Sequence, residues 1–189
     1  MGSTAFLWRR KRHAVGVESS VSALKEPGVQ LRLRAVAGWM ELGRPEEGLG
    51  ELADLPPEVL EHPEMLKVRF SILRPLRRFA DAFQTAEQIT NRAPGDKWGW
   101  LYRSHALHWM GRSGEAYSQL EPLREKFPQA FELPYDLACY CAQTGRLDEA
   151  RQLLEECFKL SGAKCDDVRG MARKDPDLEP LWDEIARDS

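Results

Sequence analysis

Apolar residues recur every three or four positions through most of the 189-residue chain, and short polar turns separate these stretches. Residues 143–160, QTGRLDEARQLLEECFKL, are typical: a Gly-Arg turn precedes a run with an apolar stripe. A stripe with this period predicts an amphipathic α-helix. One such helix cannot bury its stripe alone, so the pattern predicts helices that stack in pairs.

The turn and its flanks recur at steps of thirty-four residues. Each turn residue is followed directly by an arginine, by an acid at the fourth position and by a very small residue at the fifth. The turn residues are Gly43, Arg77, Gly111 and Gly145. The acids are Glu47, Asp81, Glu115 and Glu149, and the small residues are Gly48, Ala82, Ala116 and Ala150.

Each repeated feature has a physical reason. Glycine ends a helix at low cost because it adopts a left-handed backbone. An acid in the first turn of the next helix complements the positive end of that helix. A very small residue lets two helices approach closely. Each thirty-four-residue unit is therefore predicted to be a helix, a tight turn and a second helix.

This pattern resembles the tetratricopeptide (TPR) repeat family over about residues 29–162. The resemblance implies an all-α, right-handed α-solenoid of about four helix-turn-helix repeats with a C-terminal capping helix pair. The expected units are 29–62, 63–96, 97–130 and 131–164. The third unit matches the family best, with Trp100, Gly111, Ala116 and Pro128. Arg77 departs from the pattern, because the family has glycine at the turn.

The two ends of the chain lie outside the repeat. Residues 163–189 are predicted to form the cap as two helices, the first over about 164–174 and the second capped by Asp177. The second carries an apolar stripe of Leu178, Leu181, Trp182 and Ile185. Residues 13–27 have helical spacing and are predicted to form a truncated N-terminal helix. Residues 1–12, which contain WRRKR, are predicted to be a flexible basic tail.

The resemblance implies a binding groove, because the first helices of TPR units line a concave surface. The residues that it places there, aromatic at the centre and basic toward the N-terminal side, are Lys67, Arg74, Trp98, Leu101, His105, His108, Trp109, Tyr135 and Cys139. Such a groove favours an extended or helical peptide of a partner protein. Alternatively, the two tryptophans pack against the next unit. Ser71 and His105 occupy asparagine positions of chaperone-tail clamps, which argues against that specificity.

Charge and composition exclude several classes of function. With 27 basic and 30 acidic residues the net charge is −3, so the sequence indicates no nucleic acid and no membrane as partner. No apolar run is long enough for a bilayer and no secretion signal is evident, so a cytoplasmic location is predicted. The four cysteines are expected to be reduced and mostly buried.

No catalytic motif, cofactor-binding motif or metal-ligand motif is present, so the sequence predicts a non-enzymatic protein with no cofactor and no metal. His105 and His108 are three apart on one helix, but further metal ligands are missing. Three alternatives stay open: a secretion-type TPR chaperone, a homo-oligomerising assembly module, and an enzyme that pairs Cys139 with His105. The interaction module itself is expected to be a monomer or a weak homodimer.

Overall fold

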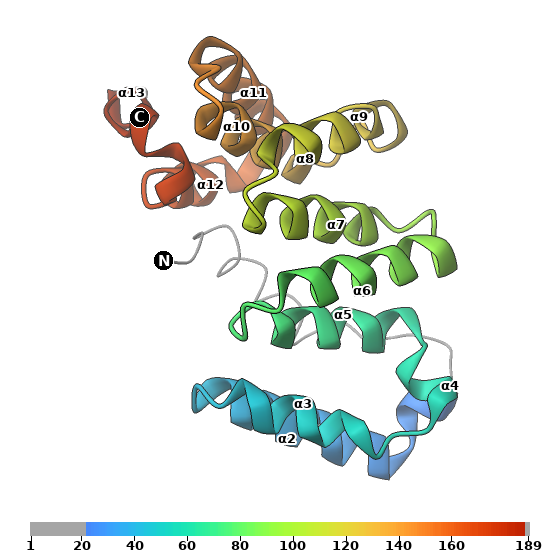
Figure 1. The fold of residues 1–189 in the computed structure, drawn as a ribbon. Helices are drawn as coiled ribbons and strands as arrows, with labels where there is room; N and C mark the ends of the chain where they lie inside the picture. Colours follow the sequence, from blue (N-terminus) through green and yellow to red (C-terminus); the bar gives the residue numbers. More distant parts are fainter. Residues whose placement is uncertain (1–21, 188–189) are drawn as a thin grey trace. The chain divides into compact units, whose positions relative to one another are not determined.

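The computed structural model describes residues 22–187 and contains no strand within that range. In chain order the elements are η1 (Ser22–Lys25), α2 (Pro27–Glu41), α3 (Pro45–Ala53), α4 (Pro57–Leu60), α5 (Pro63–Leu73), α6 (Phe79–Arg92), α7 (Lys97–Trp109), α8 (Ser113–Leu120), α9 (Leu123–Lys126), α10 (Glu132–Gln143), α11 (Leu147–Ser161), η2 (Gly162–Lys164), α12 (Cys165–Ala172), η3 (Pro176–Leu181) and α13 (Trp182–Arg187) (Figure 1). The predicted all-α architecture of tandem helix pairs is confirmed.

The described residues form two compact units, residues 22–106 and residues 107–187. We call them the N-terminal unit and the C-terminal unit. The boundary between them falls within α7, inside the predicted third repeat. No helix among residues 22–187 combines the length and the hydropathy that crossing a bilayer demands.

All four predicted turn residues adopt the left-handed backbone. The φ angles are 70° at Gly43, 55° at Arg77, 77° at Gly111 and 79° at Gly145. In each turn the N–H of the following arginine donates to a carbonyl five residues earlier, at 2.9–3.1 Å. These bonds satisfy the last carbonyls of the first helix. Arg77 is the one residue other than glycine with positive φ in the described chain, so it carries backbone strain that the three glycines avoid.

The arginine after each turn pairs with the acid three residues later, which the sequence interpretation did not anticipate. Arg78 Nε lies 2.6 Å from an oxygen of Asp81, and Arg112 Nη2 lies 2.6 Å from one of Glu115. Arg44 with Glu47 and Arg146 with Glu149 form the same pair. The repeated acid therefore interacts favourably with the positive end of the helix dipole and also forms an ion pair with the arginine beside the turn.

The small residues that follow each turn are buried, as close packing of a helix pair requires. Ala82, Ala116 and Ala150 are all fully buried, and Gly48 is buried as well. A further close approach involves Gly99 of α7. A Cβ added there would lie 2.9 Å from Ile89 Cγ2 of α6, so only glycine fits this contact.

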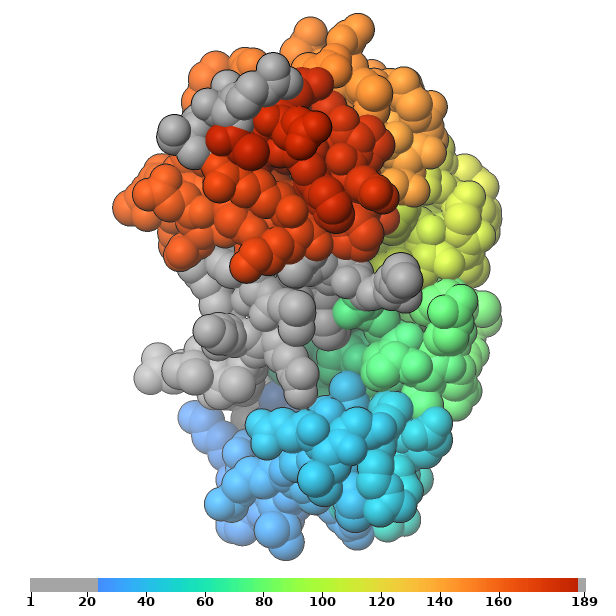
Figure 2. All heavy atoms as spheres, turned by 90° about the vertical axis from the view of Figure 1, so that its left-hand side faces the viewer, coloured from blue at the N-terminus to red at the C-terminus, as the bar shows by residue number. Residues whose placement is uncertain are grey.

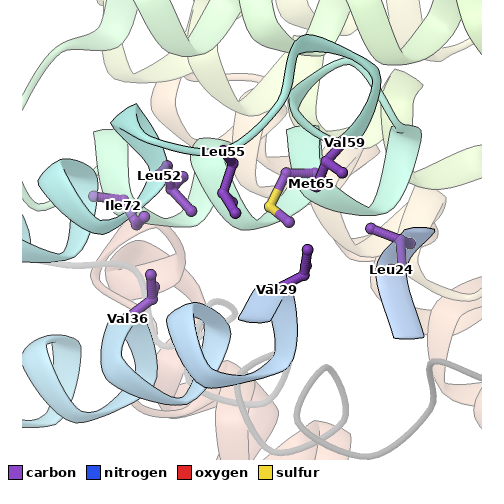
Figure 3. Close-up of a cluster of buried hydrophobic side chains, with 8 residues drawn as sticks. All are labelled: Leu24, Val29, Val36, Leu52, Leu55, Val59, Met65 and Ile72. Atoms are coloured by element: carbon purple, nitrogen blue, oxygen red, sulfur yellow. The ribbon is translucent and has the colours of Figure 1, made fainter. Parts of the chain in front are cut away.

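The N-terminal unit has its own hydrophobic core between α2, α3, α4 and α5. In Figure 3 the valines of α2 point toward side chains of the other helices. The buried members are Leu24, Val29, Val36, Leu52, Leu55, Val59, Met65 and Ile72. Proline begins all four of these helices, where its missing N–H costs nothing.

In the C-terminal unit, α10 packs against α11, α8 and η3. Of the apolar stripe predicted for the cap, Leu178, Leu181 and Ile185 are at most 4% exposed, whereas Trp182 is half-buried. In Figure 2 the C-terminal segment, in red, forms a continuous surface with the orange helices α10 and α11.

The predicted helix cap of this segment is wrong by two residues. The Asp175 carboxylate, not that of Asp177, caps the turn, and it accepts the N–H of Asp177 at 3.1 Å. Pro176 explains the difference, because a proline at the first helical position places the cap on the residue before it.

The predicted N-terminal helix of residues 13–27 lies largely outside the described residues, as does the predicted tail of residues 1–12. The described part, Ser22–Lys25, is a short 3-10 turn that ends before Pro27, where α2 begins. Leu24 of this turn is buried in the core of the N-terminal unit.

Candidate functional site

The nine residues predicted to line a groove fall in both units. Lys67, Arg74, Trp98, Leu101 and His105 belong to the N-terminal unit, and His108, Trp109, Tyr135 and Cys139 belong to the C-terminal unit. We therefore describe the two sets one after the other.

Lys67 is already neutralised inside its own unit. Its Nζ lies 2.7 Å from Glu64 Oε1 and 2.5 Å from Asp96 Oδ2, and only 13% of its side chain is exposed. Burial alone would lower the pKa of Lys67, but hydrogen bonds to Asp96 and Glu64 outweigh it and raise that pKa. The expectation that Lys67 offers its charge to a ligand is therefore wrong, because two carboxylates of the unit already hold it.

Trp98 lies at the end of a column of aromatic rings. Tyr102 stacks on Phe70 with ring centroids 4.3 Å apart and planes within 7°. The ring centroid of Trp98 lies 6.0 Å from that of Tyr102, and the ring centroid of His105 lies 6.3 Å from that of Tyr102. Phe70 and Tyr102 were not among the predicted residues, although their spacing of thirty-two is close to the repeat length.

The predicted groove residues of the N-terminal unit differ in exposure. Leu101 is fully buried and His105 is 8% exposed, so both belong to the packed interior. Arg74, the residue that ends α5, and Trp98 are half-buried. In the N-terminal unit, the partly accessible residues of the predicted surface are therefore Trp98 and Arg74.

The C-terminal unit covers its share of the predicted groove with its own chain. Tyr135 and Cys139 are only 3% and 4% exposed. The Tyr135 hydroxyl donates to Asp175 Oδ2 at 3.0 Å, and Gln143 Nε2 donates to the Asp177 carbonyl at 3.0 Å. The prediction that Tyr135 and Cys139 face a free groove is thus wrong, because η3 lies on the face of α10 that carries them.

His108 is held on both sides of its ring. Nε2 lies 3.1 Å from Asp177 Oδ2, and Nδ1 lies 2.9 Å from Ser113 Oγ. The ring also tilts against Tyr140 at 5.1 Å. Trp109, the next residue, is half-buried. His108 therefore joins the last turn of α7 to η3, a contact between segments sixty-nine residues apart.

Cys139 has the environment of an unreactive thiol. Burial, followed by the nearby carboxylates of Asp175 and Asp177, raises the pKa of Cys139 well above its usual value. A nucleophilic cysteine must be a thiolate, which this environment disfavours. All four cysteines are free thiols, and Cys139, Cys141 and Cys157 are buried, as predicted. The chemistry at Cys139 thus argues against the Cys-His enzyme.

Comparisons with known proteins bear on the fold. No family model matches the chain, and no curated protein matches its sequence. Among solved structures, the MamA RS-1 ArsTM double mutant matches with a TM-score of 0.59 at 13% identity, over 87% of this chain and 98% of that one. MamA MSR-1 C2 matches with a TM-score of 0.56 at 15% identity, over 85% and 94%. MamA contains TPR repeats, so the likeness shows a TPR-like fold.

Proposed function

We propose that this chain is a TPR protein that acts as a non-enzymatic scaffold and binds an extended peptide of a partner protein. The TPR-like fold supports this, because tandem helix pairs present long surfaces to other chains. The observation that carries the proposal is the half-buried indole of Trp98 on the stacked rings of Tyr102 and Phe70.

A tryptophan placed in this way is suited to anchor a ligand. The rings beneath it are buried and stacked, so little side-chain freedom is lost when a peptide covers the indole. The ammonium of Lys97 lies over the Trp98 ring, 5.3 Å from the ring centroid, and adds positive charge beside the indole. An acidic or polar group next to an apolar anchor in the peptide would match this surface.

Peptide selection tests the proposal. Peptides selected from a random library on the native protein are re-measured on Trp98→Ala, with affinity as the readout. Loss of a central aromatic anchor is expected to weaken binding by about tenfold or more. Trp100→Ala is the matched control, since Trp100 lies two residues along the same helix and therefore on another face. Equal affinity of native protein and Trp98→Ala would refute the assignment of this surface.

A second candidate, self-assembly, is favoured by α2. Leu31 and Leu42 are 65% and 71% exposed, which is unusual for leucine, and they are the exposed large hydrophobics of the described chain. Leu31 lies in α2 and Leu42 directly follows the helix as its C-cap. Eleven residues correspond to about three helical turns, so the two leucines lie on the same side of this segment. We propose that a second copy of the chain covers this face in a weak homodimer. Light scattering at two concentrations should show a dimer that Leu31→Gln with Leu42→Gln abolishes; a mass independent of concentration contradicts it.

A further inference from the structure

Three side chains of metal-binding types, one thiol and two carboxylates, meet where η3 covers α10. One ligand atom each from Cys139, Asp175 and Asp177 can be chosen so that all three atoms lie within 4.8 Å of one another. Cys139 comes from the middle of α10, and the two aspartates stand at the start of η3. The three residues are brought together only by the docking of η3, and nothing in the repeat pattern relates them.

The thiol of Cys139 points into this cluster without a hydrogen-bond partner among the described residues. The residue is 4% exposed, and its sulfur lies within 4.8 Å of both carboxylates. A buried thiol facing two carboxylates gains nothing from them as an anion, since all three charges would repel one another. A cation at the centre would turn that repulsion into attraction.

Neighbouring groups hydrogen-bond to the proposed ligand side chains and orient them, as the residues behind the ligands do in known metal sites. The Tyr135 hydroxyl and the Asp177 N–H donate to the two oxygens of Asp175. A carboxylate oxygen has two lone pairs, so an oxygen that accepts a hydrogen bond can also bind a metal. Ser113 Oγ lies against Nδ1 of His108 and leaves Nε2 directed at Asp177. Such partners of the second ring nitrogen are usual for a histidine ligand.

We propose that Cys139, Asp175, Asp177 and His108 form a zinc site. Sulfur, nitrogen and carboxylate oxygen are the donors that Zn²⁺ uses in tetrahedral sites. Donors around a tetrahedral zinc lie about 3.5 Å apart, so the cluster needs only a small side-chain contraction. His108 Nε2 exchanges its contact with Asp177 for the metal. The Cys139 thiol loses its proton to solvent as the sulfur–zinc bond forms, with no change of oxidation state.

The proposed zinc has a structural role. Its ligands come from α10, from η3 with its N-cap Asp175, and from the last turn of α7, all within the C-terminal unit, so one ion would tie the C-terminal segment to these elements. Metal bound to the folded but not the unfolded chain raises stability. The site revises the expectation from sequence that the chain binds no metal.

Metal analysis and cobalt spectroscopy test this proposal on the full-length, tag-free chain. Protein stripped with chelator and dialysed against Zn²⁺ should retain one zinc per chain and melt at a higher temperature than the stripped protein. Co²⁺ in place of Zn²⁺ should give the near-ultraviolet absorption of a sulfur-to-cobalt charge transfer.

Two variants and one control decide the outcome. Cys139→Ser should lose the charge-transfer absorption, and Asp177→Asn should lose stoichiometric zinc. Asp177 keeps 20% of its side chain exposed, so its exchange should leave the fold intact even where Cys139→Ser does not. Cys165→Ser, a partly exposed cysteine outside the cluster, should behave as native protein. Cobalt spectra without charge transfer, or equal zinc uptake by native protein and Asp177→Asn, would overturn the site.

Discussion

The first helix of the first predicted repeat and that of the last are buried to very different extents. In α2, two of fifteen residues are buried, and Leu31 in the helix and Leu42 directly after it are exposed. In α10, eleven of twelve residues are buried, including the polar Glu132 and Asp136. Both helices occupy the same position in the thirty-four-residue pattern, so the pattern alone does not set their exposure.

The neighbours of the two helices explain the difference. α2 packs mainly on α3 and the short turn η1, whereas α10 is enclosed by α8, α11 and η3. The C-terminal segment thus covers the α10 part of the surface that the sequence analysis assigned to a partner peptide. The available surface is consequently that of the N-terminal unit, around Trp98 and along α2, and this is where our functional proposals lie.

The largest expected effect comes from weakening the packing of η3 on α10. Leu178 in η3 is fully buried, so Leu178→Ala should cost about 2–5 kcal/mol of unfolding free energy. Urea unfolding measures the loss. The same variant should make the Cys139 thiol react faster with a thiol reagent, because η3 covers it. Leu31→Ala is the control: Leu31 is 65% exposed, and its loss should change stability by about 0.5 kcal/mol at most. Equal losses in both variants would contradict the comparison.

A smaller effect is expected where two helices of the N-terminal unit touch. Gly99→Ala would bring a Cβ to 2.9 Å from Ile89 Cγ2 and 3.1 Å from Thr90 N, so it should destabilise by about 1–3 kcal/mol. Gly114→Ala in α8 is the matched control, because nothing lies within 4 Å of its Cβ. The free energy of unfolding of Gly114→Ala should rise by about 0.4–1 kcal/mol, because alanine has a higher helix propensity than glycine. Thermal melts measure both variants. A higher melting temperature for Gly99→Ala than for Gly114→Ala would contradict the close approach of α7 to α6 at Gly99.

The four turns allow a finer test. Arg77→Gly should stabilise the chain by about 1 kcal/mol, because glycine adopts the observed φ of 55° without strain. Gly145→Ala should destabilise by a similar amount at a φ of 79°. Arg77→Gly also removes the contact of the Arg77 guanidinium with the Phe79 ring, whose centroid lies 5.5 Å away. This loss reduces the gain in stability. Unfolding midpoints of both variants provide the measurement, and a loss of stability in Arg77→Gly speaks against strain at this turn.

The smallest effect is a titration in the C-terminal unit. Burial and the hydrogen bond to Glu149 raise the pKa of Tyr117 to about 12. The folded state therefore holds this proton more tightly than the unfolded state. The resulting stability is complete below about pH 10 and is lost as the pH rises toward 12. The pKa of Tyr117 follows from the tyrosinate absorbance of native protein minus that of Tyr117→Phe, measured as a function of pH. Ionisation of Tyr117 near pH 10 would contradict the raised pKa.

The sequence by itself determined the local backbone. Positive φ at Gly43, Arg77, Gly111 and Gly145 follows from position in the repeat, even where arginine replaces glycine. The buried small residues and the apolar stripe of the C-terminal segment were predictable for the same reason. Each depends on a spacing along one or two adjacent helices, and such spacings are visible in a single sequence.

Only the tertiary structure decided which helix faces remain exposed and which are covered by other parts of the chain. The partners of Lys67, the stacking of Tyr102 on Phe70 and the meeting of Cys139 with Asp175 join residues of different helices. The docking of η3 on α10 depends on how the buried apolar stripe of the last segment finds a complementary face. Periodicity specifies that such a stripe must be covered but not what covers it, because the hydrophobic effect has no direction.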